Sequence, residues 1–273
     1  MANQYIHGSS ATERSRLALM NDLINERCLE ALGLEEEKRV LDVGAGTGQF
    51  TRLMSASLPR ESTIVAVEHN PDQVQAALQL ADGDTGTCIV DFRIGDAVHL
   101  PLDPEEIGSF DLAHARFLLE HVPDPGAVVR SMVAALRPGG RIALADDDHH
   151  LLRLWPEPEG LVEAWRAYYR SYRQFGADPL VGRKLVSLLV EAGARPARIT
   201  QLFWGGCAGS PEFGPVMDNL IGVMQGARST VLASAEITAR DYDTAIKNLG
   251  KFRKLPDAAF WYVINWAEGR KPG

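Results

Sequence analysis

Apolar and polar positions follow two alternating patterns along the first half of the chain. Short runs of mostly apolar residues give way to stretches in which apolar residues recur at helical spacing. The short runs are RVLDVG, STIVAVEH, CIVDFRIGDA, FDLAHAR and RIALADDD. Each run has the length of a strand, and the near-continuous apolar run RVLDVG is typical of a strand buried on both faces. Strands that alternate with helices indicate a parallel, doubly wound sheet with right-handed crossovers.

A helix is expected before this alternation, and the rhythm breaks after Asp148. Apolar residues recur at helical spacing from Leu17 to Ala31, behind a Ser10 to Glu13 segment that fits a capping box. Beyond Asp148 the pattern predicts helices at 157–176, 178–193 and 211–252, and strands at 198–206 and 259–269. The predicted fold class is α/β: a doubly wound, mostly parallel, seven-stranded, Rossmann-like sheet with an N-terminal helix and helical cap insertions.

Composition narrows the class of ligand and the compartment. The chain has 273 residues, of which 45% are apolar, enough for a large core, and a net charge of −8. That charge argues against a surface that tracks nucleic-acid phosphates and favours small molecules. We see no signal peptide and no apolar stretch long enough for a membrane span. The three cysteines form no CxxC pair, which suits reduced thiols in a cytoplasm and gives no zinc or disulfide framework.

The segment LDVGAGTGQF, residues 41 to 50, joins the first strand to a helix through Gly44, Gly46 and Gly48. A glycine turn there brings backbone close to a ligand at the carboxyl edge of the sheet. The fingerprint of dinucleotide-binding proteins is GxGxxG, and here Gln49 stands where its third glycine would be. The carboxylate of Glu68, at the end of the second strand, could accept hydrogen bonds from the ribose hydroxyls of any adenosine ligand. It therefore does not distinguish a dinucleotide-binding protein from one that binds another adenosine cofactor.

With the pieces that follow, the sequence resembles the class I S-adenosylmethionine-dependent methyltransferases. The matching pieces, in family order between residues 40 and 146, are VLDVGAGTG, Glu68, the GDA at 95–97, FDLAHARFLLEHVPDP and LRPGG. The YIHGSS opening and the DPLVGRKLVSLLVEAGA segment extend the likeness to ubiquinone-biosynthesis-like enzymes that act on small molecules. The resemblance implies S-adenosylmethionine as the cofactor.

Carried over residue by residue, the resemblance implies a set of cofactor contacts. Asp42 and the backbone of Gly44, Ala45 and Gly46 would face the methionine part. Glu68 would hold the ribose, and His69 and Gln73 would flank the adenosine. Asp96 would bond the adenine amino group, with Ala97 beside the ring, and Ala115 and Arg116 would lie near the cofactor. Tyr5 and Asn21 would be lid contacts if the opening segment folds over the cofactor; a plain amphipathic first helix is the alternative.

Methyl transfer is an in-line displacement, so the protein has mainly to orient two molecules and exclude water. A hydroxyl acceptor also needs a base. The base candidates are His149 and His150, in the Asp146 to His150 segment after the fifth strand, and His121, which otherwise packs or caps a helix. The same segment could instead hold a divalent ion or be a solvated strand end. Adjacent residues on a strand point to opposite faces of the sheet, so these five residues cannot all converge on one ion unless a loop curls. No metal site is therefore predicted.

Trp165, Tyr169 and Tyr172 share one face of the helix predicted at 157–176. These aromatic side chains either line a pocket for the methyl acceptor or belong to the hydrophobic core. The helical stretch at 211–252 is likewise cap or packing, and we expect both insertions to shape the choice of acceptor.

The predicted domain is single, 1–273, because no repeat or low-complexity linker divides it. Its predicted parts are a lid or helix at 1–37, a cofactor-binding half at 38–148, cap elements at 149–197 and 208–257, and last strands at 198–207 and 258–268.

The predicted function is methyl transfer from S-adenosylmethionine to oxygen, nitrogen or carbon of a small-molecule acceptor, in secondary-metabolite or quinone-type biosynthesis. An alternative is a cofactor-binding protein of the same fold repurposed for other chemistry or regulation. Gln49 and LRPGG oppose a nicotinamide-dependent oxidoreductase. The absence of an NPPY-like segment and of a basic arm opposes a nucleic-acid enzyme. We expect a cytoplasmic protein, with no nucleic-acid or membrane partner, in which two copies could exchange the N-terminal helix as a homodimer.

Overall fold

The computed structural model describes residues 11–34, 37–81 and 88–273. The predicted capping residue Ser10 and the lid candidate Tyr5 lie outside them. The chain divides into two compact units. The large-sheet unit comprises Asn25–Asp147, Val181–Gln201 and Asn265–Gly273. The small-sheet unit comprises Asp148–Leu180, Leu202–Ile264 and the described residues up to Ile24.

The large sheet has seven strands in the order β3-β2-β1-β4-β5-β10-β7. The strands from β1 to β5 that neighbour one another pair in parallel, and β10 pairs antiparallel with β5. A mostly parallel seven-stranded sheet is therefore confirmed. The strands are β1 (Arg39–Val43), β2 (Thr63–Glu68), β3 (Ile89–Ile94), β4 (Phe110–Arg116), β5 (Leu136–Asp146), β7 (Arg195–Phe203) and β10 (Val263–Arg270).

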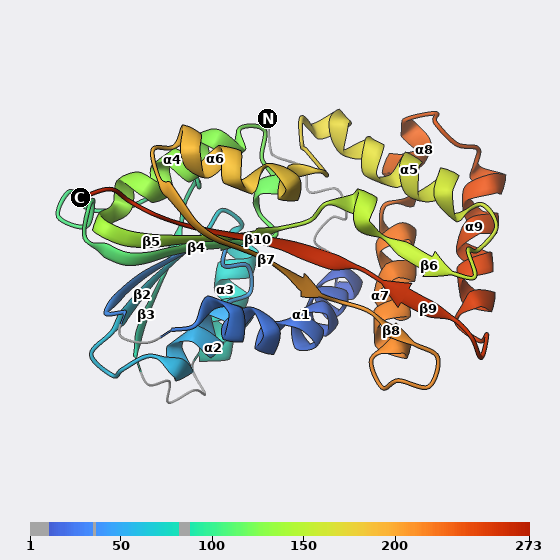
Figure 1. Cartoon of the computed structure of the whole chain (residues 1–273), viewed down its shortest axis with the longest axis horizontal. Helices are drawn as coiled ribbons and strands as arrows, with labels where there is room; N and C mark the ends of the chain where they lie inside the picture. The colour runs from blue at the N-terminus through green and yellow to red at the C-terminus, as the bar shows by residue number, and fades with distance from the viewer. Residues whose placement is uncertain (1–10, 35–36, 82–87) are drawn as a thin grey trace. The chain divides into compact units, whose positions relative to one another are not determined.

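Helices cover both faces of the large sheet, as Figure 1 shows: α4 and α6 lie on one face, and α2 and α3 on the other. The central strands β1, β2 and β4 are apolar at most positions because both of their faces are buried, whereas the edge strands are partly (β3) or largely (β7) exposed. No surface is exposed on Leu41, Val43, Ala113 or Leu144. The helical segments of this unit are α2 (Gln49–Ser57), α3 (Pro71–Ala81), η1 (Leu119–His121), α4 (Pro125–Ala135), η4 (Val181–Lys184) and α6 (Leu185–Glu191).

The first helix, α1 (Ala11–Leu32), has its carboxyl end fixed to the large sheet by two arginines. Arg141 of β5 donates to the carbonyl oxygen of Leu32 at 2.6 Å, across 109 residues of sequence. Arg198 of β7 donates to the carbonyl oxygen of Ala31, across 167 residues. The last carbonyl groups of a helix have no partner within the helix and carry partial negative charge. Both guanidinium groups therefore cap the end of α1.

The small-sheet unit is built on three short strands in the order β6-β9-β8. They are β6 (Arg153–Trp155), β8 (Gly206–Cys207) and β9 (Ala259–Trp261). This second sheet was not predicted from the sequence. Its helical segments are η2 (His149–Leu151), α5 (Leu161–Ser171), η3 (Tyr172–Phe175), α7 (Phe213–Gly226), α8 (Arg228–Ala233) and α9 (Ala239–Phe252).

Two element boundaries differ from the predictions for a physical reason. The run AFWYVINWAEG was predicted as one strand, but β9 pairs with β6 and β8, whereas β10 pairs with β5. The residues 178–193 were predicted as one helix, but α6 begins only at Leu185. A Cβ atom on Gly182 would lie 2.5 Å from the carbonyl oxygen of Asp146. This close approach of backbone to the end of β5 is made by η4, a tighter helix, before α6 starts.

Among the described residues, no helix combines the length and the apolar character that crossing a bilayer requires.

Candidate functional site

The glycine turn lies between β1 and α2, at the carboxyl edge of the large sheet. Gly44, Gly46 and Gly48 have φ angles of 78°, 58° and 73°, which residues with a side chain rarely adopt. The N–H groups of Gly44 and Ala45 both donate to the carbonyl oxygen of Val67, at 2.8 and 3.1 Å. The turn is thus fixed to the end of β2. A Cβ atom on Gly46 would lie 3.3 Å from Oε1 of Gln73, so the predicted contact residue Gln73 lies beside the turn.

Glu68 ends β2 and joins the turn through its carboxylate. Its Oε2 accepts a hydrogen bond from the N–H of Gly46 at 3.1 Å, and its Oε1 accepts one from the N–H of Asn70 at 2.9 Å. The Nδ1 of His69 lies 2.9 Å from the same Oε1. Burial works against ionisation of Glu68, but the bonds from His69, Asn70 and Gly46 outweigh it and lower its pKa.

His69 is an exposed neighbour of this carboxylate. The hydrogen bond to Glu68 raises the pKa of His69, against a smaller opposing effect of burial. The two residues predicted at the ribose and beside the adenosine therefore form an ion pair when His69 is protonated.

Asp42 lies within β1 and is buried, with 3% of its surface exposed. Its Oδ2 accepts a hydrogen bond from Oγ1 of Thr51 at 2.6 Å, and its Oδ1 lies 2.9 Å from Nδ1 of His114. These bonds connect β1, the first turns of α2, and β4 beneath the glycine turn. The carboxylate thus supports the turn through protein contacts, and its predicted contact with the methionine part stays a prediction.

Asp96 and Ala97 follow β3 at the same edge. One oxygen of the exposed Asp96 carboxylate accepts the N–H of Val98 at 2.6 Å. The N–H of Gly95 donates to the carbonyl oxygen of Glu68 at 3.0 Å, which holds the Asp96 segment beside the end of β2. The large-sheet unit therefore brings Glu68, Gln73 and Asp96 to one edge of the sheet, and their contacts with an adenosine stay a prediction.

Ala115 and Arg116 end β4 on the other side of β1. Ala115 is buried and pairs with Val43, the last residue before the glycine turn. The Nη2 of Arg116 donates to Oδ1 of Asn25 at 2.8 Å. Asn25 belongs to α1, whose position could not be derived from spacing alone.

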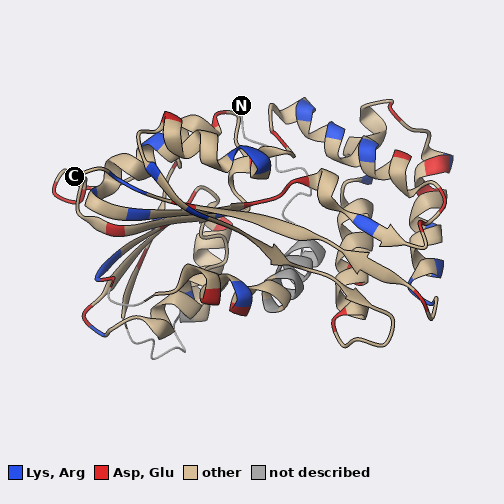
Figure 2. Ribbon diagram, in the orientation of Figure 1, with Lys and Arg blue, Asp and Glu red and all other residues tan. Residues whose placement is uncertain are grey.

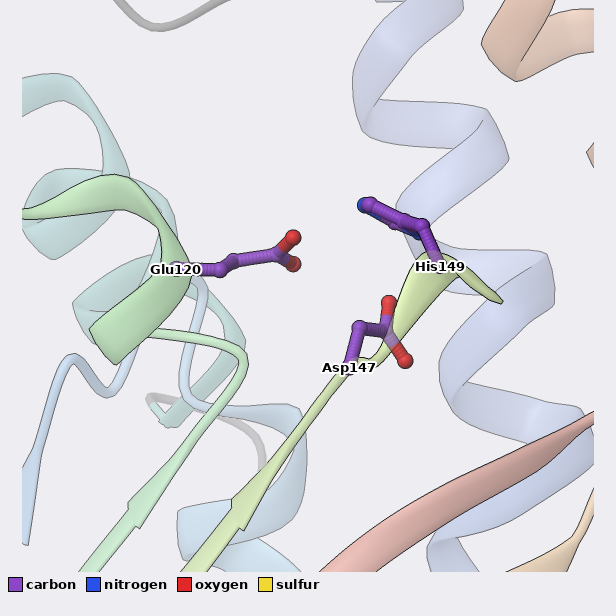
Figure 3. Close-up of side chains that lie close together, drawn as sticks. All are labelled: Glu120, Asp147 and His149. Atoms are coloured by element: carbon purple, nitrogen blue, oxygen red, sulfur yellow. The ribbon is translucent and has the colours of Figure 1, made fainter. Parts of the chain in front are cut away.

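Carboxylates gather after β4 and β5 in the large-sheet unit. Asp146, fully buried, accepts the N–H of Leu119 at 2.7 Å and the N–H of Asp147 at 3.0 Å. Burial first, and then the charges of Glu120 and Asp147, raise the pKa of Asp146 well above its usual range. Figure 3 shows Glu120 and Asp147, whose carboxylate oxygens come within 4.8 Å of each other. His149, also labelled there, belongs to the small-sheet unit.

The candidate base His121 follows Glu120 on η1. Its Nε2 lies 3.4 Å from Oε1 of Glu120, and the imidazole is half-buried. Glu120 lies within FDLAHARFLLEHVPDP but was not among the predicted site residues, because no spacing distinguishes a buried glutamate from an exposed one.

In the small-sheet unit, His149 is buried among aromatic rings. Its Nδ1 lies 3.2 Å from the hydroxyl of Tyr262, and its ring packs edge-on against Trp165, Tyr168 and Tyr172 at centroid distances of 5.3 to 5.6 Å. The indole N–H of Trp165 donates to the carbonyl oxygen of His149 at 2.7 Å. These contacts bring the predicted base together with two of the predicted pocket residues.

The other predicted pair lies apart from that cluster. The ring of His150 packs against Tyr169 at 5.1 Å, and His150 is exposed. Only 2% of the surface of Tyr172 is exposed, and its hydroxyl lies 3.0 Å from that of Tyr168. Tyr172 therefore packs in the interior of its unit.

Tyr168 was missed although it lies three residues after Trp165 and four before Tyr172, on the same helix face, where its ring stacks on Trp165. Tyr262 was missed because it lies far along the chain, where no local spacing connects it to this helix.

The family model described as a methyltransferase domain matches residues 13–193. A ubiquinone biosynthesis O-methyltransferase of Xanthomonas axonopodis pv. citri is 38% identical over 108 residues, which are 39% of this chain and 42% of that protein. The chain spans less than half the length of the first curated relatives that it matches.

Solved structures share the fold at low identity. The Haemonchus contortus phosphoethanolamine N-methyltransferase 2, solved with phosphomonomethylethanolamine and S-adenosylhomocysteine, is 18% identical, with a TM-score of 0.52 over 95% of this chain and 53% of that one. The [4+2]-cyclase SpnF is 19% identical, with a TM-score of 0.56 over 92% of this chain and 80% of that one. These likenesses confirm the fold class, and the family match confirms the resemblance drawn from the motifs.

Proposed function

Because the chain belongs to the family of methyltransferase domains, we propose that it transfers a methyl group from S-adenosylmethionine to a small-molecule acceptor. The observation that carries the proposal is the hydrogen bond between Gly46 and Glu68, which joins the glycine turn to a buried, ionised carboxylate. A carboxylate at that point can accept hydrogen bonds from ribose hydroxyls. The turn offers backbone without side chains beside it, and Asp96 lies at the next strand end.

The donor supplies a methyl carbon bonded to a positively charged sulfur. The residues of this chain have two tasks: to orient the donor and acceptor and to exclude water. Glu68 fixes the donor through its ribose, while Asp42 keeps the turn in place through Thr51 and His114. A hydroxyl or phenol acceptor must also lose its proton, and His149 and His121 are the candidates to take it.

Charge supports a small acceptor. The chain carries a net charge of −8, and Figure 2 shows acidic and basic residues on both units. Nucleic-acid enzymes usually carry a basic face. The name of the Xanthomonas relative, an O-methyltransferase of ubiquinone biosynthesis, favours an oxygen acceptor, and that of the Haemonchus N-methyltransferase favours a nitrogen acceptor. The proposal covers both: a phenol must lose its proton to a base, whereas an amine needs only to be unprotonated when it attacks the methyl carbon.

The test is to incubate the chain with S-adenosylmethionine and a panel of phenols, quinone precursors and amines and to measure S-adenosylhomocysteine. Product with one class of acceptor would support the proposal and name the acceptor class. Binding of NADH, with no affinity for S-adenosylmethionine, would overturn it.

A second candidate function is non-methyl-transfer chemistry on the same fold. The specific observation in its favour is the likeness to a cyclase, although at 19% identity that likeness concerns the fold. Bound S-adenosylmethionine without S-adenosylhomocysteine production from any acceptor in the panel would favour this second function.

A further inference from the structure

The small sheet has one face covered by a helix. Side chains alternate between the faces along a strand, and the two residues of a pair point to the same side. Leu154 and Phe260 are paired and buried, and Phe260 also pairs with Gly206. A Cβ atom on Gly206 would lie 3.2 Å from the backbone nitrogen of Phe213, the first residue of α7. Helix α7 therefore covers this face, behind β8 and β9 in Figure 1.

The opposite face of the small sheet is mostly apolar but exposed. Trp155, Ala259 and Cys207 form a row across it, because Ala259 pairs with both of the others. Trp261 lies on the same side, two residues after Ala259, and pairs with Arg153. The exposed fractions are 71% for Trp155 and 56% for Trp261. Two of the largest apolar side chains of this unit thus face solvent together.

The aromatic rings on this side form a continuous patch. Trp155 and Trp261 are diagonal neighbours across β6 and β9, a spacing within reach of aromatic side chains. Phe203, which is 42% exposed, packs edge-on against Trp261 at a centroid distance of 6.2 Å. We call the open face the set of Arg153, Trp155, Phe203, Cys207, Ala259 and Trp261. Burying one aromatic side chain removes about 150–250 Å² from water, so the three rings expose about 250–400 Å². A contiguous apolar patch of this size is among the largest on a typical monomer and is often an interaction site.

We propose that two copies of this chain bind to each other through the open face. Two copies that cover each other's rings bury about 500–800 Å² of aromatic surface, and a stable interface needs about 1,200 Å² in total. Arg153 and Cys207 are exposed on the same face and add to the buried area. This area lies at the lower limit for a stable interface, so the dimer should dissociate in the micromolar range.

The charge of the open face favours a second copy over other partners. Arg153 is the only charged residue of the six, and its Nη1 donates to the carbonyl oxygens of His150 and Leu152 at 2.6 and 2.7 Å. A guanidinium fixed in this way can stack on an aromatic ring. The face thus presents both the cation and the rings, which is the self-complementary set that a two-fold interface requires. Binding to an anionic membrane takes a cluster of basic residues, and the chain has a net charge of −8.

The test is analytical ultracentrifugation of the full chain over a range of concentrations, which measures the dissociation constant of the dimer. Trp261→Glu places a carboxylate within the patch and should weaken dimerisation at least 30-fold, roughly the effect of losing an interface hot spot. Trp155→Glu, in the neighbouring row, should act in the same direction, and Trp261→Phe should retain most of the affinity. Ile107→Glu, at an apolar residue of the large-sheet unit that is 59% exposed, is the matched control and should dimerise as the wild type does.

The thiol of Cys207 gives a second readout within the open face. A maleimide should label Cys207 more slowly as the protein concentration rises, because the second copy covers it, and peptide mass spectrometry measures the rate. Cys88, a half-buried thiol of the large-sheet unit, is the internal control and should be labelled at a constant rate. In Trp261→Glu, Cys207 should be labelled at the rate of the monomer at every concentration. A circular dichroism spectrum that matches the wild type shows that this variant is folded.

A wild-type chain that stays monomeric at about 100 µM would overturn the inference. A dimer with the same dissociation constant in folded Trp261→Glu would also overturn it, because another surface, such as an exchanged N-terminal helix, would then hold the two copies. A monomer that binds vesicles of phosphatidylcholine and phosphatidylglycerol, and no longer binds them in Trp261→Glu, would overturn it in favour of a lipid surface.

Discussion

The carboxylate of Asp146 holds the backbone of Leu119, whose N–H donates to its Oδ2 at 2.7 Å. Asp146 ends β5 and Leu119 begins η1, the turn that carries Glu120 and His121. A buried acid therefore positions the segment after β4. Because burial and two neighbouring carboxylates raise its pKa, the acid holds its proton more firmly in the folded protein than in the unfolded chain.

The pH dependence of stability should reveal this proton. As the pH rises above about 4, the unfolded chain releases the Asp146 proton while the folded protein retains it. The unfolded state then binds fewer protons, so this residue lowers the free energy of unfolding as the pH rises towards its raised folded pKa. Asp146→Asn cannot ionise, so its free energy of unfolding, measured with urea, should fall less over this range. The exposed Asp257→Asn is the control. Parallel curves for Asp146→Asn and wild type would contradict the expectation.

Donor binding should depend on Glu68. Glu68→Ala removes the carboxylate that accepts the Gly46 and Asn70 N–H groups and is proposed to hold the ribose. We expect S-adenosylmethionine binding to weaken by about 1–3 kcal/mol, measured by calorimetry. Glu61→Ala, at an exposed glutamate before β2, should bind as wild type does. Unchanged affinity in Glu68→Ala would remove this residue from the ribose.

The glycine turn should tolerate no side chain at its last glycine. In Gly48→Ala the new Cβ atom would lie 2.7 Å from Cζ of Phe92, at a φ angle of 73°. We expect a loss of about 2–4 kcal/mol in the free energy of unfolding, from strain and overpacking together. Gly108→Ala has a φ angle of 79° but nothing within 4 Å of the new atom. It should lose only about 1–2 kcal/mol. Equal losses would show that packing against Phe92 does not matter.

The histidines after β5 should differ in their effect on turnover. His149 is buried and lies 3.2 Å from the Tyr262 hydroxyl, whereas His150 is exposed against Tyr169. With an acceptor identified by the panel, we expect His149→Ala to reduce kcat about 100-fold, the contribution of a general base. His150→Ala should stay near wild type, and a melting curve of His149→Ala guards against misfolding. Full activity in both variants, with and without a chelator, would show that the Asp146 to His150 segment has no role in catalysis and is only a strand end.

Sequence could predict the parts of the site that depend on local pattern. The glycine turn and Asp96 follow strand ends in a fixed order, with Glu68 as the last residue of β2, and the central strands β1, β2 and β4 are mostly apolar because both of their faces are covered. Contacts between distant segments leave no such pattern. The pairing of Asp42 with His114 and of Arg116 with Asn25 spans 72 and 91 residues.

The small sheet was missed for a different reason. Its strands have two or three residues, too few for a period to appear. β9 is also followed almost directly by β10, with no turn-forming residues between them, so the pattern predicts a single strand.

The capping of α1 has a consequence for the order of folding. The carbonyl groups at its carboxyl end receive Arg141 and Arg198, which are 109 and 167 residues away in sequence. We expect contacts of such separation to form late in folding, because closing a long loop costs conformational entropy before the contact stabilises anything. The end of α1 that carries Asn25 and Cys28 should then gain its caps only after β5 and β7 have joined the sheet. We therefore expect the carboxyl end of the first helix along the chain to be among the last segments to be fixed.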